Sequence, residues 1–186
     1  MLRALLTDAI EMTRAGGPLT TANVLRTVAM QDSFAVMAMT RAREAARRWH
    51  VPFVNRALRL AQIAMFGVEV GKDVHMGAGV MLVHTVGTVI GGDARIGARV
   101  RLMGNNTIGT ARDNGYPVIE DDVVVGAGAR ILGPVRVGKG ARIGANAVVL
   151  SDVPAGALAV GIPAKITPPS ARAGDSVPPP KASSGR

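Results

Sequence analysis

The sequence of 186 residues contains no cysteine and very few aromatic residues. Without cysteine the chain can form neither a disulfide framework nor a thiolate zinc site. Aromatic residues make up 3% of the chain and hydrophobic residues 48%, so the core must be built from aliphatic side chains. No apolar run approaches the roughly 18 residues of a membrane span, and the charged N-terminal stretch does not resemble a secretory signal. These absences predict a cytoplasmic protein.

The charge of the chain is unbalanced towards the basic side. Lysine and arginine number 22 against 13 acidic residues, which gives a formal net charge of +9. This excess favours an anionic partner, such as a phosphate-bearing cofactor or an anionic surface. A recognised nucleic-acid-binding motif and an aromatic stacking platform are both missing, so no nucleic-acid partner is predicted.

A repeat of six residues dominates the middle of the sequence. Thirteen anchor positions carry an aliphatic residue or Met, and Gly follows 8 of them, which makes the pattern of six regular. A period of six matches neither an α-helix nor a simple alternating strand. It is typical of a parallel β-solenoid in which three hexads form one triangular coil. The anchors are Val70, Met76, Leu82, Ile90, Ile96, Leu102, Ile108, Ile119, Val125, Ile131, Val137, Ile143 and Val149.

The chain divides into three parts. Residues 1–67 show helical periodicity, with Thr20 or Thr21 as a possible N-cap and Gly67 as a possible C-cap. Residues 68–166 are predicted to form the solenoid. Residues 167–186 are rich in Pro, Ser and Gly with almost no apolar content, which predicts a disordered tail.

One basic stretch stands out within the helical part. It contains Arg41, Arg43, Arg47 and Arg48. We expect these side chains to form a solvated helix face, with attachment to an anionic membrane surface as the alternative.

The first interruption of the repeat lies between the anchors Leu82 and Ile90, where two residues are added. An insertion in a solenoid leaves the stack intact and pushes a loop out of one corner. This loop carries His84, one of only three histidines in the chain. His84 is therefore either a surface histidine or a candidate for acid–base chemistry.

The second interruption lies between Ile108 and Ile119, where five residues are added. The inserted loop is polar. It carries Arg112, Asp113, Asn114 and Tyr116.

The runs EVGKDVHMGAGVMLVHTVGTVIGGDARIG and VVVGAGARILGPVRVGKGARIGANAVVLSDVPAGALAVGIPAKI resemble the serine acetyltransferases of the hexapeptide-repeat acyltransferase superfamily. The match is dense over residues 68–166 and looser over residues 33–67. The resemblance implies a mainly β fold, a left-handed parallel β-helix preceded by a short α-helical region. It also implies a homotrimer, or a dimer of trimers, with acetyl-CoA bound between adjacent solenoids.

The resemblance assigns the catalytic residues by position. His84 falls on the family's catalytic histidine, which removes the proton from the acceptor hydroxyl. Glu69 falls on the carboxylate that pairs with this histidine, where the serine enzymes usually have Asp. A neutral imidazole is a suitable general base, and a carboxylate behind it fixes its tautomer.

The resemblance also assigns an acetyl-CoA site. Gly109 and Thr110 match a Gly-rich turn beside the pantetheine arm. Ala127 and Ala145 match small coil positions whose backbone faces the cofactor. Arg142 and Lys165 match basic positions near the CoA end.

The acceptor side departs from the family pattern. Val83 stands where the serine enzymes usually carry Asp, and Gly115 and Tyr116 stand where they carry an Arg-His pair. The second loop is three residues shorter, and the Asp that the family's helical domain supplies to the serine site has no clear counterpart. Val83, Asn114 and Tyr116 are predicted to contact the acceptor, with the Tyr116 ring over its pocket.

These residues predict an acetyl-CoA-dependent O-acetyltransferase acting on serine or a serine-like acceptor by direct attack. A sugar hydroxyl is the alternative acceptor, and a noncatalytic scaffold is the alternative of another class. A zinc enzyme of the carbonic anhydrase type needs three His per metal. The solenoid has only His75 and His84, so no metal is predicted. The chain also lacks the C-terminal Ile with which the family docks a sulfhydrylase, so no such complex is predicted.

Overall fold

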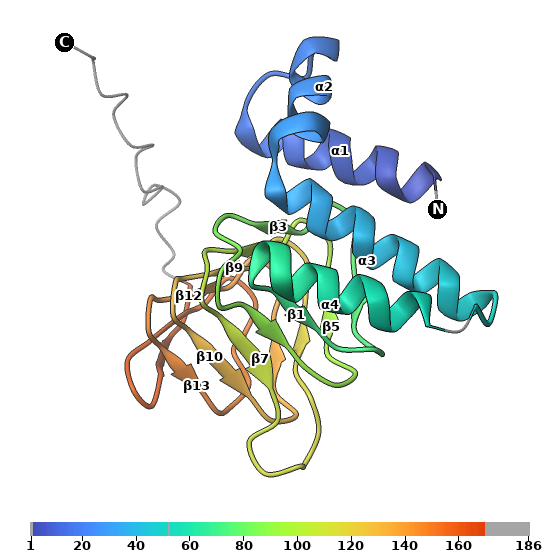
Figure 1. Cartoon of the computed structure of the whole chain (residues 1–186). Coiled ribbons are helices and arrows are strands. Elements are labelled where there is room, and N and C mark those ends of the chain that lie inside the picture. Colours follow the sequence, from blue (N-terminus) through green and yellow to red (C-terminus); the bar gives the residue numbers. More distant parts are fainter. Residues whose placement is uncertain (1, 52, 170–186) are drawn as a thin grey trace.

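The computed structural model describes residues 2–51 and 53–169, and it places four helices against one end of a β-solenoid (Figure 1). The helices are α1 (Leu2–Gly16), α2 (Thr21–Met30), α3 (Asp32–Arg48) and α4 (Val54–Phe66). Most of the segment predicted to be a disordered tail, residues 170–186, lies outside the described residues.

Local sequence signals account for the helix ends. The hydroxyl of Thr20 accepts a hydrogen bond from the backbone N–H of Asn23 at 3.2 Å, so Thr20 caps α2 as expected. Gly67 ends α4 with φ of 62°, a left-handed conformation that glycine adopts without strain. None of the helices in the described part of the chain has the length and apolarity needed to cross a membrane.

Within the part of the chain that the structure describes, fifteen short strands follow the helices. They are β1 (Glu69–Val70), β2 (His75–Met76), β3 (Met81–Leu82), β4 (Val89–Ile90), β5 (Arg95–Ile96), β6 (Arg101–Leu102), β7 (Thr107–Gly109), β8 (Val118–Ile119), β9 (Val124–Val125), β10 (Arg130–Leu132), β11 (Arg136–Val137), β12 (Arg142–Ile143), β13 (Val148–Val149), β14 (Leu158–Val160) and β15 (Lys165–Thr167).

The strands form three sheets that run along the solenoid. Their orders are β1-β4-β7-β10-β13, β11-β8-β5-β2 and β15-β14-β12-β9-β6-β3. From β1 to β10 each strand pairs in parallel with the third strand further along the chain, so three strands make one coil. The last pair, β14 with β15, is antiparallel and closes the end. The predicted parallel solenoid is confirmed.

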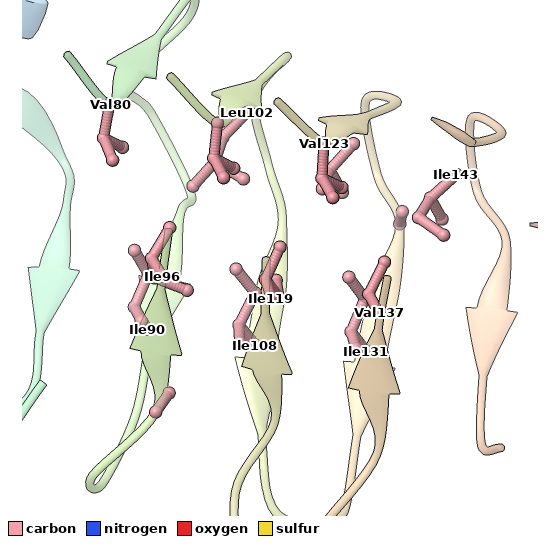
Figure 2. Packing of buried hydrophobic residues seen from close by; sticks show 14 of the residues in the cluster. Val80, Ile90, Ile96, Leu102, Ile108, Ile119, Val123, Ile131, Val137 and Ile143 are labelled. Atoms are coloured by element: carbon pink, nitrogen blue, oxygen red, sulfur yellow. The ribbon is translucent and has the colours of Figure 1, made fainter. Parts of the chain in front are cut away.

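Aliphatic ladders fill the interior of the coils. Ile90 is in register with Ile108, and Ile108 with Ile131, so the same side chain stacks on three successive coils (Figure 2). All three are fully buried. Stacking of like side chains explains how a core with so few aromatic residues can be closely packed.

The expectation of a solvated arginine face on α3 is wrong for Arg41. Its guanidinium bonds Asp8 of α1 at 3.0 Å and donates to the carbonyl oxygens of Met76 and Gly77 at 2.7 and 2.8 Å. Burial alone lowers the pKa of Arg41, but the hydrogen bond and charge of Asp8, together with Glu44, outweigh it and raise the pKa. Arg41 therefore joins α1, α3 and the first coil.

The expectation is also wrong for Arg43, which is buried. Its guanidinium donates to Gln62 at 2.6 Å, to Asn55 at 2.8 Å and to the carbonyl oxygen of Val70 at 2.9 Å. Burial lowers the pKa of Arg43, and the positive charges of Arg47 and Arg59 add to this. Arg43 thus fixes α3 to α4 and to β1, which sets the position of the helices above the first coil.

Candidate functional site

His84 lies on the connection between β3 and β4, and its side chain is exposed. The connection is held to its neighbours by backbone hydrogen bonds from Val83 to Leu102 at 2.8 Å and from Gly87 to Gly67 at 3.0 Å. The first interruption of the repeat is therefore an ordered loop that presents an imidazole to solvent.

The next coil leaves room for His84. A Cβ atom at Gly104 would lie 2.8 Å from the Cβ of His84, so only glycine fits there in this arrangement. Asn106 is buried beneath it, and its Oδ1 accepts from the Gly104 N–H at 3.0 Å while its amide donates to the Gly126 carbonyl oxygen at 2.7 Å. Asn106 stands at a coil position that otherwise carries Val or Ala, and this departure is the signal in the sequence that could have identified it.

An open cavity of about 570 Å³ lies beside His84. It is lined by residues 30–33, at the junction of α2 and α3, and by residues 81–86 of β3 and its loop. Asp32 and His84 are the two lining residues with ionisable side chains. Val83 also lines this cavity, as its predicted acceptor contact requires.

Asp32 is a cavity residue that was not predicted from the sequence. It is the first residue of α3, and the next residue, Ser33, is buried and accepts a hydrogen bond from the Leu82 N–H at 3.0 Å. This bond ties the start of α3 to the strand that leads into the His84 loop. The carboxylate is also favoured at this end of the helix by the helix dipole.

Glu69 opens β1, in register with Val89 just after the His84 loop. Its side chain is partly exposed, and its Oε1 forms an ion pair with Arg59 of α4. Within the described residues its carboxylate bonds Arg59 and not His84. The predicted pair of His84 and Glu69 stays a prediction, and Glu69 lies on the coil edge that the His84 loop also follows.

The other predicted site residues near His84 and the second loop lie along two edges of the solenoid. The histidine edge consists of the connections after β3, β6, β9 and β12, which are residues 83–88, 103–106, 126–129 and 144–147. The loop edge consists of the connections after β4, β7 and β10, which are residues 91–94, 110–117 and 133–135, together with Gly109, the last residue of β7. The two edges lie on opposite sides of the same sheet, β1-β4-β7-β10-β13.

Tyr116 and Asn114 lie on the loop edge. The Tyr116 ring packs over Gly92, where an added Cβ would come within about 2 Å of ring atoms. Asn114 lies next to Gly133 of the following coil. Neither residue lines the His84 cavity, so a single chain does not bring the predicted cover of the acceptor pocket to the base.

The predicted cofactor residues divide between the two edges. Ala127 and Ala145 are exposed on the histidine edge, on successive coils joined by a 2.8 Å hydrogen bond from the Asn146 N–H to the Ala127 carbonyl oxygen. Gly109 and Thr110 are on the loop edge. The Thr110 Oγ1 is buried and has no hydrogen-bond partner in the described part of the chain. A buried hydroxyl without a partner can serve a bound ligand.

The two predicted basic positions lie on one sheet near the end of the solenoid. Arg142 is in β12, and Lys165 is in β15, separated from it by the single strand β14. Both side chains are exposed. No group of three or more His, Asp or Glu side chains in residues 2–51 and 53–169 is arranged to hold a metal ion.

Comparison with known proteins gives consistent matches. The family model described as Bacterial transferase hexapeptide (six repeats) matches residues 116–151. A serine acetyltransferase from Helicobacter pylori is 45% identical over 118 residues, which cover 61% of this chain and 68% of that protein. One from Bacillus licheniformis is 40% identical over 119 residues, covering 61% of this chain and 54% of the relative. The chain therefore spans only about half the length of some relatives.

Solved structures match over a larger part of the chain. A soybean serine acetyltransferase complexed with serine has a TM-score of 0.79 and 30% identity, covering 89% of this chain and 70% of the other. A Neisseria gonorrhoeae serine acetyltransferase in complex with serine has a TM-score of 0.78 and 28% identity, covering 88% and 68%. The helices and the coils together thus match these structures, and the solenoid is a left-handed parallel β-helix.

Proposed function

Since the chain belongs to the serine acetyltransferase family and is an acyltransferase, we propose that it transfers an acetyl group from acetyl-CoA to the hydroxyl of serine or a serine-like hydroxy amino acid. The observation that carries this proposal is the shared cavity of His84 and Asp32. Such an acceptor carries a hydroxyl group, which an imidazole can deprotonate, and an ammonium group, which a carboxylate can bind. His84 and Asp32 supply this imidazole and this carboxylate in one cavity.

In the proposed reaction His84 acts as the general base. Its neutral imidazole takes the proton of the acceptor hydroxyl, whose oxygen then bonds to the acetyl carbon. The carbon–sulfur bond breaks, and the imidazolium returns the proton to the departing sulfur. Holding hydroxyl and thioester together supplies much of the remaining rate enhancement.

Glu69 is the proposed partner of His84. A carboxylate has two oxygens, and only Oε1 contacts Arg59, so Oε2 can accept a hydrogen bond from the imidazole. That bond would fix the tautomer of His84 and stabilise the imidazolium.

The acetyl-CoA site is proposed to lie between two chains. Ala127 and Ala145 are on the histidine edge, whereas Gly109 and the Thr110 hydroxyl, which has no hydrogen-bond partner among the described residues, are on the loop edge. A cofactor that touches both sets can do so where the histidine edge of one chain meets the loop edge of another. This arrangement also brings Tyr116 and Asn114 of one chain towards His84 of its neighbour, and a trimer closes it by symmetry. Arg142 and Lys165 would attract the phosphates of CoA.

A neutral acceptor such as a sugar hydroxyl is the second candidate. Val83 lines the cavity next to His84 and carries no charge, so only Asp32 remains to hold an ammonium. If Asp32 instead bonds hydroxyl groups, the same cavity suits a sugar.

The test is a measurement of CoA release by the purified full chain with acetyl-CoA and a panel of L-serine, L-homoserine and nucleotide sugars. We expect serine or homoserine to have the highest kcat/KM.

His84→Ala should lower kcat by about 10²- to 10⁴-fold while acetyl-CoA binding measured by calorimetry is kept. His75→Ala, an exposed histidine on β2, is the control and should keep full activity. A faster reaction with a nucleotide sugar would favour the second candidate, and no CoA release with any acceptor would contradict both.

A further inference from the structure

The end of the α3–α4 helix pair carries an exposed aromatic surface. Trp49 is 76% exposed and Phe53 is 82% exposed, and Val51 between them is also exposed. These two rings belong to a chain that has only three Phe, one Trp and one Tyr. Exposed aromatic residues gathered at one place mark an interaction site more often than exposed single aliphatic residues do.

The apolar surface continues along α4. Phe53, Ala57, Leu60 and Ala64 are spaced as on one face of a helix, and all four are exposed. In Figure 1 the end of α3 and the start of α4 reach beyond the coils of the solenoid. We call this surface, formed by residues 48–51, 53, 56, 57, 60 and 64, the helical tip.

The helical tip is basic as well as apolar. Residues 45–68 contain four Arg and no acidic residue. Arg47 pairs with Asp73 and Arg59 with Glu69, so these charges are partly balanced. The exposed Arg48 and Arg56 form no ion pair within residues 2–51 and 53–169.

We propose that the helical tip is a docking surface for an anionic phospholipid bilayer. A helix with an apolar stripe flanked by arginines binds in the plane of a membrane interface, with its apolar side chains among the headgroups. Trp49 and Phe53 suit this position because aromatic rings are favoured at the boundary of water and hydrocarbon. Arg48 and Arg56 then lie where the negative surface potential of anionic lipids attracts them.

The single tryptophan makes the proposal directly measurable. Trp49 is the only Trp in the chain, so its fluorescence reports on the helical tip alone. The full chain is titrated with vesicles of phosphatidylglycerol and phosphatidylcholine, and with vesicles of phosphatidylcholine alone. We expect a blue shift of the emission and co-sedimentation with the first vesicles, weakening as salt is raised, and neither effect with the second.

Matched variants separate the tip from the rest of the surface. Phe53→Ser should weaken vesicle binding about tenfold or more. Arg48→Gln and Arg56→Gln should each weaken it about fivefold. The control replaces two exposed residues of α2, Leu25→Ser together with Arg26→Gln, and should bind as the unaltered chain does.

Three results would overturn the proposal. The first is an unshifted Trp49 emission with anionic vesicles. The second is equal loss of binding in the α2 control, which would indicate a nonspecific effect of charge. The third is an emission that is already blue-shifted without lipid, together with a lower solution mass for Phe53→Ser, which would show that a second copy of the chain covers the tip. None of these measurements depends on catalysis.

Discussion

At the scale of single residues, Asp32 bears most directly on the choice of acceptor. Its carboxylate shares the cavity with His84, and the residue beside the imidazole, Val83, is uncharged. If Asp32 holds the ammonium of the acceptor, Asp32→Asn should raise the KM for L-serine by about tenfold or more, because a charge-assisted hydrogen bond is replaced by a neutral one. The KM for acetyl-CoA should be unchanged, and steady-state kinetics with each substrate varied in turn measures both.

The control for this substitution is Asp121→Asn on the connection between β8 and β9, away from both edges, where an Asn Oδ1 can still accept the hydrogen bond from the Ala98 N–H. The comparison acceptor is 3-hydroxypropionate, which is serine without its amino group. Asp32→Asn should not weaken the use of this acceptor. Equal effects on serine and on 3-hydroxypropionate would count against an ammonium site at Asp32.

Gly104 offers a second test at the residue scale. Gly104→Ala would place a Cβ 2.8 Å from the Cβ of His84, so the imidazole must move. A displacement of about 1 Å can cost about 100-fold in rate, so we expect a large fall in kcat with little change in the KM for acetyl-CoA.

Gly140→Ala is the matched control for Gly104→Ala. Both glycines have positive φ, so both substitutions strain the backbone, but an added Cβ at Gly140 meets no atom within 4 Å. Equal losses of kcat in the two variants would show that backbone strain, and not displacement of His84, lowers the rate.

At the scale of elements, Arg43 connects the helices to the first coil. Arg43→Met keeps much of the side-chain volume but leaves Gln62 and the Val70 carbonyl oxygen without their donor. Buried polar groups without partners are costly, so we expect the free energy of unfolding to fall by about 3 kcal/mol. Denaturant unfolding measures this free energy.

The control is Arg48→Met, on the exposed side of the same helix, which should change the free energy of unfolding by less than about 0.5 kcal/mol. Similar losses in the two variants would refute the role of Arg43.

The repeat made the solenoid predictable from sequence, because every coil must bury the same kind of anchor. Ile90 and Ile108 illustrate this, since they are three uninterrupted hexads apart and lie in register on one sheet. The break between Leu82 and Ile90 also identified the loop of His84 as a candidate site. Local periodicity carries this information without knowledge of distant contacts.

Contacts between distant segments could not be predicted in the same way. Arg43 looked like part of a solvated face because its partner, the Val70 carbonyl oxygen, is a backbone atom that leaves no signature in the sequence. Asp32 was missed because the cavity joins the start of α3 to the loop after β3, about 50 residues later. An acidic residue at the start of a helix does not by itself indicate a binding site, and only the fold shows that Asp32 lies beside His84.

At the scale of the whole molecule, the division of site residues between two edges predicts shared sites. Two inactive variants can test this. His84→Ala disables the histidine edge. Gly109→Leu fills the proposed cofactor space on the loop edge, where an added Cβ meets only Thr107, at 3.9 Å, within the chain. If sites form between chains, about one site in three of each mixed trimer should regain activity, because only one of its three chain pairs joins an intact histidine edge to an intact loop edge. If each chain builds its own site, every site in the mixture carries a defect and activity stays at the level of the separate variants. Differently tagged chains, purified in tandem so that every molecule contains both variants, give the measurement, and solution mass shows whether the mixed assemblies are trimers.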